Sequence, residues 1–151
     1  MQVLNLPPAN LTVREESGKR LVFDSFRKRF VALTPEEWVR QHFLHWLVTH
    51  KAYPRGLIAV ETTLRYLRLK KRADAIVYRQ SGQPLMIIEC KSPDVQITQN
   101  VFDQVARYNK PHGVAYLAVT NGLSHYCCHW QPGAASWQFL DTFPDFNQLS
   151  S

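Results

Sequence analysis

Residues 72–91 read RADAIVYRQSGQPLMIIECK, which is two stretches of strand character separated by Ser81-Gly82. Valine, isoleucine and tyrosine favour strands, and a Ser-Gly pair between two such stretches is typical of a hairpin turn. If Ser81 and Gly82 are the two turn residues, the register of the hairpin puts Asp74 directly opposite Glu89. The sequence therefore predicts a hairpin that brings two carboxylates together away from its turn.

The second strand of this hairpin ends in Glu89-Cys90-Lys91, directly after the apolar run of residues 85–88. Such a run is typical of a strand buried on both faces, and charged residues at its end indicate a site. Because side chains alternate along a strand, Lys91 shares a face with Glu89, whereas Cys90 points the other way. Opposed carboxylates repel each other unless a cation offsets them. Magnesium prefers such hard oxygen ligands, so the pattern predicts a Mg²⁺ or Mn²⁺ site at Asp74 and Glu89.

A divalent cation at these carboxylates suits hydrolysis of phosphodiester bonds, because it polarises a phosphoryl oxygen and lowers the pKa of a bound water. Lys91 would orient that water, deprotonate it, or stabilise the negative charge that develops, and the sequence leaves these three roles open. The alternative interpretation is a solvent-facing hairpin whose two acids form ordinary surface ion pairs with Lys91, Lys71 or Arg72.

A helix is expected to begin at Thr34-Pro35-Glu36-Glu37, a capping box with proline at the first helical position. In such a box the side chain of Glu37 reaches back to the cap. A second helix is expected over residues 98–109, where apolar residues recur at helical spacing. Further strands are expected over residues 57–64, 114–120, 124–130 and 137–140, between turn signals.

The length of 151 residues suits one domain, and the composition of 45% hydrophobic and 20% charged residues is that of an ordinary globular protein. Residues 1–20 are expected to be an N-terminal arm, residues 21–146 the domain, and residues 147–151 a C-terminal tail. The start of the chain lacks the features of a signal peptide, and no segment has the length of a membrane span.

Lysine and arginine outnumber the acids by 18 to 12, and the formal net charge of +6 favours association with polyanions such as nucleic acids. The cationic clusters at residues 27–29 and 70–72 are either phosphate contacts or solvated loops. Cysteine is present at three positions, Cys90, Cys127 and Cys128, which argues against a disulfide framework and for a reducing cytoplasm.

The acidic and basic residues of the hairpin resemble the motif of the PD-(D/E)XK nuclease superfamily. That motif is an acidic residue in one strand and Glu-x-Lys in the next, here Asp74 and Glu89-Cys90-Lys91. Residues 104–108 fit the Gln-x-x-x-Tyr element of the RecB-like and type I branches. Residues 33–41 look like the family's first-helix signature, and residues 119–122 look like its late strand and turn. The likeness spans about residues 22–145 and is specific to the N-terminal nuclease domain of type I restriction enzyme motor subunits.

The resemblance implies an α/β fold with a restriction-endonuclease-like core, in which a central mixed β-sheet is flanked by α-helices. The catalytic residues that it implies are Asp74, Glu89, Lys91, Gln104 and Tyr108. The metal ligands that it implies are Asp74, Glu89, the carbonyl oxygen of Cys90, and Glu37. The capping box explains Glu37 without any metal, and the adjacent Glu36 is an alternative for its place in the site.

The expected function is that of a magnesium-dependent DNA endonuclease of the restriction, defence or DNA-processing type. DNA is the expected partner, with a second protein or a second copy of the chain as further alternatives. No Gly-x-x-x-x-Gly-Lys-Ser/Thr phosphate loop is present, so no ATP-driven motor is expected in this chain. Two other functions stay open: a catalytically weak or inactive nucleic-acid-binding or complex-forming module, and a protein-interaction domain whose basic character is incidental.

Overall fold

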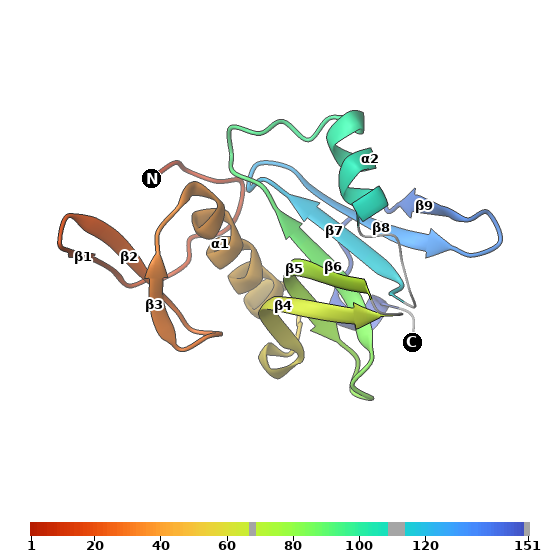
Figure 1. Ribbon diagram of the computed structural model, residues 1–151, viewed down its shortest axis with the longest axis horizontal. Coiled ribbons are helices and arrows are strands. Elements are labelled where there is room, and N and C mark those ends of the chain that lie inside the picture. Colours follow the sequence, from red (N-terminus) through yellow and green to blue (C-terminus); the bar gives the residue numbers. More distant parts are fainter. Residues whose placement is uncertain (67–68, 109–113, 150–151) are drawn as a thin grey trace.

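The computed structural model describes the backbone of residues 1–66, 69–108 and 114–149, and their side chains apart from those of residues 62–72 and 108. Within these ranges the chain forms two β-sheets, two α-helices and two short 3₁₀ helices (Figure 1). The elements are β1 (Val13–Glu16), β2 (Lys19–Asp24), β3 (Arg29–Ala32), α1 (Pro35–His50), η1 (Arg55–Leu57), β4 (Ile58–Tyr66), β5 (Leu69–Tyr78), β6 (Pro84–Cys90), α2 (Gln99–Tyr108), β7 (Tyr116–Thr120), β8 (His125–Gln131), β9 (Ser136–Phe139) and η2 (Phe146–Gln148).

The larger sheet contains six strands in the order β4-β5-β6-β7-β8-β9. Strands β6 and β7 are parallel and are connected through α2, while every other neighbouring pair is antiparallel. Helices α1 and α2 cover opposite faces of this sheet (Figure 1). The fold class expected from the sequence, a central mixed sheet flanked by helices, is therefore confirmed.

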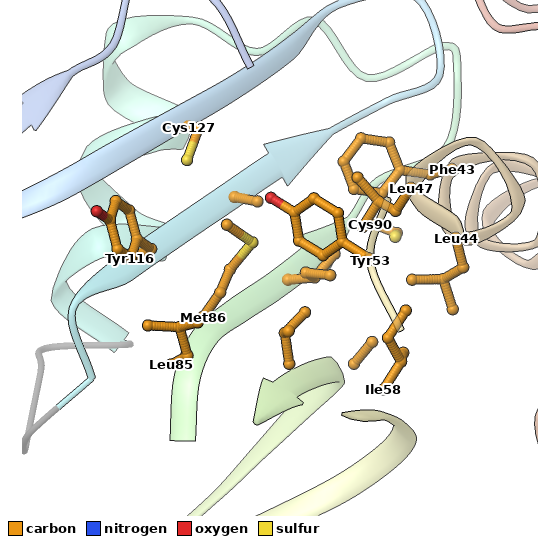
Figure 2. Close-up of a cluster of buried hydrophobic side chains, with 14 of the residues drawn as sticks. Phe43, Leu44, Leu47, Tyr53, Ile58, Leu85, Met86, Cys90, Tyr116 and Cys127 are labelled. Atoms are coloured by element: carbon orange, nitrogen blue, oxygen red, sulfur yellow. The ribbon is translucent and has the colours of Figure 1, made fainter. Parts of the chain in front are cut away.

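Strand β6 is buried on both faces, as its apolar run predicted. Met86 and Ile88 belong to a core cluster that includes Phe43 of α1 (Figure 2), whereas Ile87 between them packs with Phe102 of α2. Alternate residues of one strand thus contribute to two separate cores. A strand in this position holds its carboxyl end rigidly, which suits it to carry functional residues.

The turn of the β5–β6 hairpin is longer than predicted. The amide of Arg79 donates to the carbonyl oxygen of Gln83 at 2.8 Å, so residues 80–82 form the loop instead of Ser81 and Gly82 alone. Gly82 has φ of 91°, a left-handed conformation that a glycine adopts without strain. A three-residue hairpin loop commonly ends on such a residue.

A register shift between Val77 and Tyr78 compensates for the extra turn residue. Such a bulge inserts one residue into one strand and thereby moves every later pair by one position. Beyond it Val77 pairs with Met86, which is the pairing that the two-residue turn predicted. The predicted turn is wrong, but the predicted register of the strands is confirmed.

The N-terminal arm expected over residues 1–20 contains β1 and the start of β2. Strands β1, β2 and β3 form an antiparallel sheet, and the expected boundary after residue 20 falls inside β2. Ser17 and Gly18 turn the chain between β1 and β2 with φ of 53° and 76°. Ahead of this sheet, Leu4 packs against the main core, and the Asn5 amide donates to the Gly122 carbonyl oxygen at 2.8 Å.

The expected tail from residue 147 onward also differs from the structure, since residues 147 and 148 belong to η2 and Leu149 packs on the main core. Cys90, Cys127 and Cys128 are free thiols in the core. In the described part of the chain, no helix is long and apolar enough to cross a membrane.

Candidate active site

The predicted carboxylates lie where the β5–β6 ladder ends. The last paired positions are Ala75 and Ile88, and the next residues along the two strands are Asp74 and Glu89. The Cys90 amide donates to Asp74 Oδ2 at 2.7 Å, so this carboxylate reaches from β5 to the backbone of β6. Glu89 is half-buried, with its Oε1 atom buried. The structure therefore brings Asp74 next to the Glu-x-Lys segment, as the hairpin register predicted.

Lys91 follows β6 directly and is held by the parallel pairing with β7. Its amide donates to the carbonyl oxygen of Thr120 at 2.8 Å, and the residue is half-buried. Glu89 continues the face of Ile87, which looks toward α2, while Cys90 packs in the core on the α1 side. Alternation thus separates Glu89 and Cys90 onto opposite faces, as predicted.

Glu37 is placed by the N-terminus of α1, but its carboxylate does not serve the cap. Thr34 Oγ1 accepts a hydrogen bond from the Glu37 amide at 3.0 Å, which confirms the threonine half of the predicted capping box. The carboxylate instead accepts hydrogen bonds from Arg27 at 2.8 Å, from Arg40 Nε at 3.1 Å and from Gln41 at 2.9 Å. Only 5% of the residue is exposed.

These donors set the protonation of Glu37. Burial alone would raise the pKa of this carboxyl, but the hydrogen bonds from Arg40 and Gln41 and the charge of Arg40 outweigh it, and the pKa is lowered. The carboxylate is therefore ionised and fully engaged with its neighbours. This engagement competes with the metal-ligand role that the resemblance implies for Glu37.

Arg40 connects this cluster to the predicted catalytic residue of β5. Its Nη1 atom donates to the carbonyl oxygen of Asp74 at 3.3 Å and lies 3.9 Å from Asp74 Oδ1. Its Nη2 atom also donates to Glu37 Oε1 and, at 3.2 Å, to Glu61 Oε1 of β4. Burial would lower the pKa of Arg40, but the hydrogen bond and the charge of Glu37 raise it. Arg40 thus holds the backbone of Asp74 in place.

Arg27 joins the smaller sheet to the same cluster. It lies between β2 and β3 and forms ion pairs with the buried Asp24, with Glu37 and, at 2.8 Å, with Glu61 Oε2. Sequence reasoning placed Arg27 in a cationic cluster for phosphate contacts or solvent, and it missed Arg40, Asp24 and Glu61 entirely. One signal was present, because Glu37 and Arg40 are three residues apart on one helix and so face the same side.

A cavity of about 450 Å³ lies between this cluster, β3 and the end of the hairpin. Its described lining includes Asp74 and Cys90 but neither Glu89 nor Lys91. The charged residues that line it are Arg27, Arg29, Glu36, Glu37, Arg40, Glu61 and Asp74. Asp74 and Cys90 therefore face this cavity on the α1 side of the sheet, whereas Glu89 continues the α2-side face, and neither Glu89 nor Lys91 lines the cavity.

Among the residues that the structure describes, no three His, Cys, Asp or Glu side chains lie close enough to hold a metal ion together. The remaining donor set is the two carboxylates of Asp74 and Glu89 with the backbone carbonyl of Cys90. By donor type that set would suit magnesium, which is usually held by one or two carboxylates and keeps water molecules in its other positions.

The two predicted residues of α2 are less well connected to this site. Gln104 is exposed, while Phe102 and Val105 of the same helix pack against the sheet. Tyr108 ends α2, and its side chain lies outside the described residues. Their roles in catalysis therefore stay predictions.

With the geometry in place, comparison with known proteins gives the family. The chain matches the family described as Type I restriction enzyme R protein N terminus (HSDR_N) over residues 35–144. The chain belongs to this family. The matched segment includes α1, the β5–β6 hairpin and the strands that follow α2.

A solved structure has a similar fold. It is a fragment described as an HsdR subunit of a type I restriction enzyme from Vibrio vulnificus YJ016, and it aligns with a TM-score of 0.53. The two sequences are 19% identical, and the alignment covers 78% of this chain and 24% of that one. This chain therefore spans about a quarter of that subunit's chain. No curated protein is similar enough to count as a relative.

Proposed function

We propose that the chain is a Mg²⁺- or Mn²⁺-dependent DNA endonuclease of the PD-(D/E)XK kind, working in restriction, defence or DNA processing. The observation that supports this proposal is the register of the β5–β6 hairpin, in which Asp74 and Glu89 follow the last paired residues and the Cys90 amide donates to the Asp74 carboxylate. Membership of the type I restriction enzyme R protein family supports the restriction type of reaction. Assembly with further subunits and with DNA belongs to the same proposal.

In this proposal Asp74, Glu89 and the carbonyl oxygen of Cys90 hold the metal ion. When bound there, the ion would polarise the scissile phosphate and lower the pKa of a bound water. Other residues of the chain position these ligands. The Cys90 amide orients the Asp74 carboxylate, and Arg40 fixes the backbone at the same residue.

Lys91 is the proposed general acid-base or charge-stabilising group. Its ammonium group, two residues beyond Glu89 along the chain, would orient the attacking water, accept its proton, or stabilise the charge that develops on the phosphate. Gln104 and Tyr108 are proposed to approach the same substrate from α2. The Lys91 amide donates a hydrogen bond to the Thr120 carbonyl oxygen, and this bond holds the backbone from which the lysine side chain extends.

The test is cleavage of supercoiled plasmid by the purified chain with magnesium or manganese. Lys91→Ala should lower the rate by about a hundredfold or more, because positioned acid-base groups contribute about 10²–10⁴ in rate. The matched control is Lys51→Ala, which removes a lysine that pairs with the half-exposed Asp145 at the other end of α1. Equal cleavage by the wild type and the Lys91 variant would exclude this mechanism.

The second candidate function is a binding module of the same fold with little or no catalysis. One observation favours it: the net charge of +6, which favours association with a polyanion. Binding to DNA without any metal should then weaken steeply as salt rises, because phosphate contacts release counterions. A protein that binds no DNA even at low salt would contradict both candidate functions.

A further inference from the structure

The smaller sheet has one face that the rest of the molecule leaves open. Along β2, Val22 and Asp24 are fully buried, while the alternating residues Leu21 and Phe23 point to the other side. Phe23 is 37% exposed, which is a high value for a phenylalanine on a strand. The outer side of this sheet is therefore partly apolar and open to solvent.

Two aromatic rings lie side by side on this outer face. Phe23 of β2 pairs in register with Phe30 of β3, and their ring centroids are 5.3 Å apart in an edge-on arrangement. The guanidinium carbon of Arg14 from β1 lies 3.8 Å from the centroid of Phe30. A cation thus already lies against one ring, while Phe23 is open to a planar ligand.

Cationic residues outnumber acidic ones over the smaller sheet as a whole. Among the exposed residues of β1 to β3 and their turns, five are cationic and two are acidic. The cations are Arg14, Lys19, Arg20, Lys28 and Arg29, and the acids are Glu15 and Glu16. By strand alternation Arg14, Glu16 and Lys19 share the outer face with the two rings, whereas Arg20 and Arg29 lie on the other face. Arg14 forms an ion pair with Glu16 at 2.9 Å. We call the outer surface formed by Arg14, Glu16, Lys19, Phe23 and Phe30 the basic aromatic face.

This face runs into the cavity of the candidate active site. Phe30 and Ala32 of β3 line the same cavity as Asp74. In addition, Arg27, which lies between β2 and β3, forms an ion pair with Glu37 of α1 and so fixes the small sheet beside the site. Strand β3 therefore borders both the basic aromatic face and the cavity that Asp74 lines.

We propose that the basic aromatic face binds a single-stranded segment of nucleic acid. Open aromatic rings bind unpaired bases by stacking, and surrounding arginine and lysine side chains bind the phosphates between them. A duplex keeps its base faces stacked inside and offers only its backbone to such a surface. The inference rests on the proposed function in one respect, since the bound strand is the one that would enter the active site.

The experiment measures the affinity of the purified chain for a labelled oligothymidylate by fluorescence anisotropy, in EDTA so that no cleavage occurs. Phe23→Ala should weaken binding about fivefold to a hundredfold, as expected for the loss of one stacked base. The matched control is Phe139→Ala in β9, which removes a phenylalanine of 44% exposure at the opposite end of the molecule (Figure 1). This control should bind as the wild type does.

A second variant keeps the test decisive if Phe23→Ala folds poorly. Phe23→Trp should retain affinity, and the fluorescence of the added tryptophan should be quenched when the oligonucleotide binds. A blunt duplex of the same length should compete weakly for the same protein. Equal binding by the Phe23→Ala and Phe139→Ala variants would overturn the proposal, as would a duplex that competes better than the single strand.

The outcome is separable from that of the nuclease proposal. Lys51→Ala should bind the oligothymidylate as the wild type does, because Lys51 pairs with Asp145 at the other end of α1, away from the basic aromatic face and the candidate site. Binding that depends on Phe23, without any cleavage of plasmid, would refute the nuclease and keep this inference. Cleavage of plasmid, together with binding that does not depend on Phe23, would refute this inference and keep the nuclease proposal.

Discussion

Replacing Arg40 with methionine should destabilise the fold far more than the loss of a surface ion pair. The arginine side chain is only 8% exposed and contacts Glu37, Glu61 and the backbone of Asp74. Methionine keeps much of the volume of the side chain but none of its donors. The variant leaves Glu37, which is 5% exposed, with Arg27 and Gln41 as its hydrogen-bond donors.

Removing one partner of a buried ion pair costs about 3–5 kcal/mol, because the other charge stays buried without compensation. Glu37 keeps its bond to Arg27 at 2.8 Å, so the lower end of this range, about 3 kcal/mol, is expected here. For a domain of this size, each kcal/mol lowers the melting temperature by about 2–4 °C. The expected decrease is therefore about 6–12 °C.

The measurement is urea unfolding followed by circular dichroism, with Arg14→Met as the control. Arg14 also forms an arginine–glutamate pair, at 2.9 Å with Glu16, but its side chain is 50% exposed. Its loss should cost less than about 1 kcal/mol. In the double variant Glu37→Gln with Arg40→Met, the cost should be smaller than the sum of the single costs. Equal losses for the Arg40 and Arg14 variants would refute the account of a buried, coupled cluster.

Three further outcomes are expected. First, because the pKa of Glu37 is lowered, its contribution to stability is present above the ordinary carboxyl pKa of about 4.3 and is lost as the pH falls through the lowered pKa. The free energy of unfolding should therefore decrease less between pH 7 and pH 3 for Glu37→Gln than for the wild type. Second, Gly122→Ala should destabilise by about 1–3 kcal/mol in thermal unfolding, because φ is +85° and the new Cβ would lie 2.8 Å from Leu4 Cδ2; an unchanged melting temperature would contradict this. Third, burial raises the pKa of Cys128 to about 12 and that of Cys127 still further, so a disulfide reagent at pH 8 should react with these thiols only after urea is added.

The sequence predicted the parts of the fold that depend on local pattern. The apolar run before Glu89 indicated a strand buried on both faces, and the threonine and proline ahead of Glu37 indicated the start of α1. Both are local signals, because alternation and capping involve residues a few positions apart. The pairing of Asp74 with the segment after β6 was also predictable, since the two strands of a hairpin are joined by a short turn.

For the β5–β6 hairpin, the predicted strand register is right although the predicted turn is one residue too short. Gly82 marked the turn, but the loop contains one residue more than Ser81 and Gly82 suggested, and a bulge at Val77 and Tyr78 restores the register. The bulge has no distinct signal in these residue types. The extra residue is Leu85 of β6, which packs in the same core as the neighbouring Met86.

By itself, then, the sequence determined the two helices, the strands of the main sheet and the approach of Asp74 to Glu89, because each follows from periodicity or from a short connection. Only the tertiary structure decided the surroundings of that pair. Arg27, Arg40 and Glu61 come from three separate segments, and apart from the helical spacing of Glu37 and Arg40 nothing in their own neighbourhoods says which acid each arginine binds. A charged side chain makes no periodic pattern of its own, and its partner is set only when packing has removed the water that would otherwise solvate it.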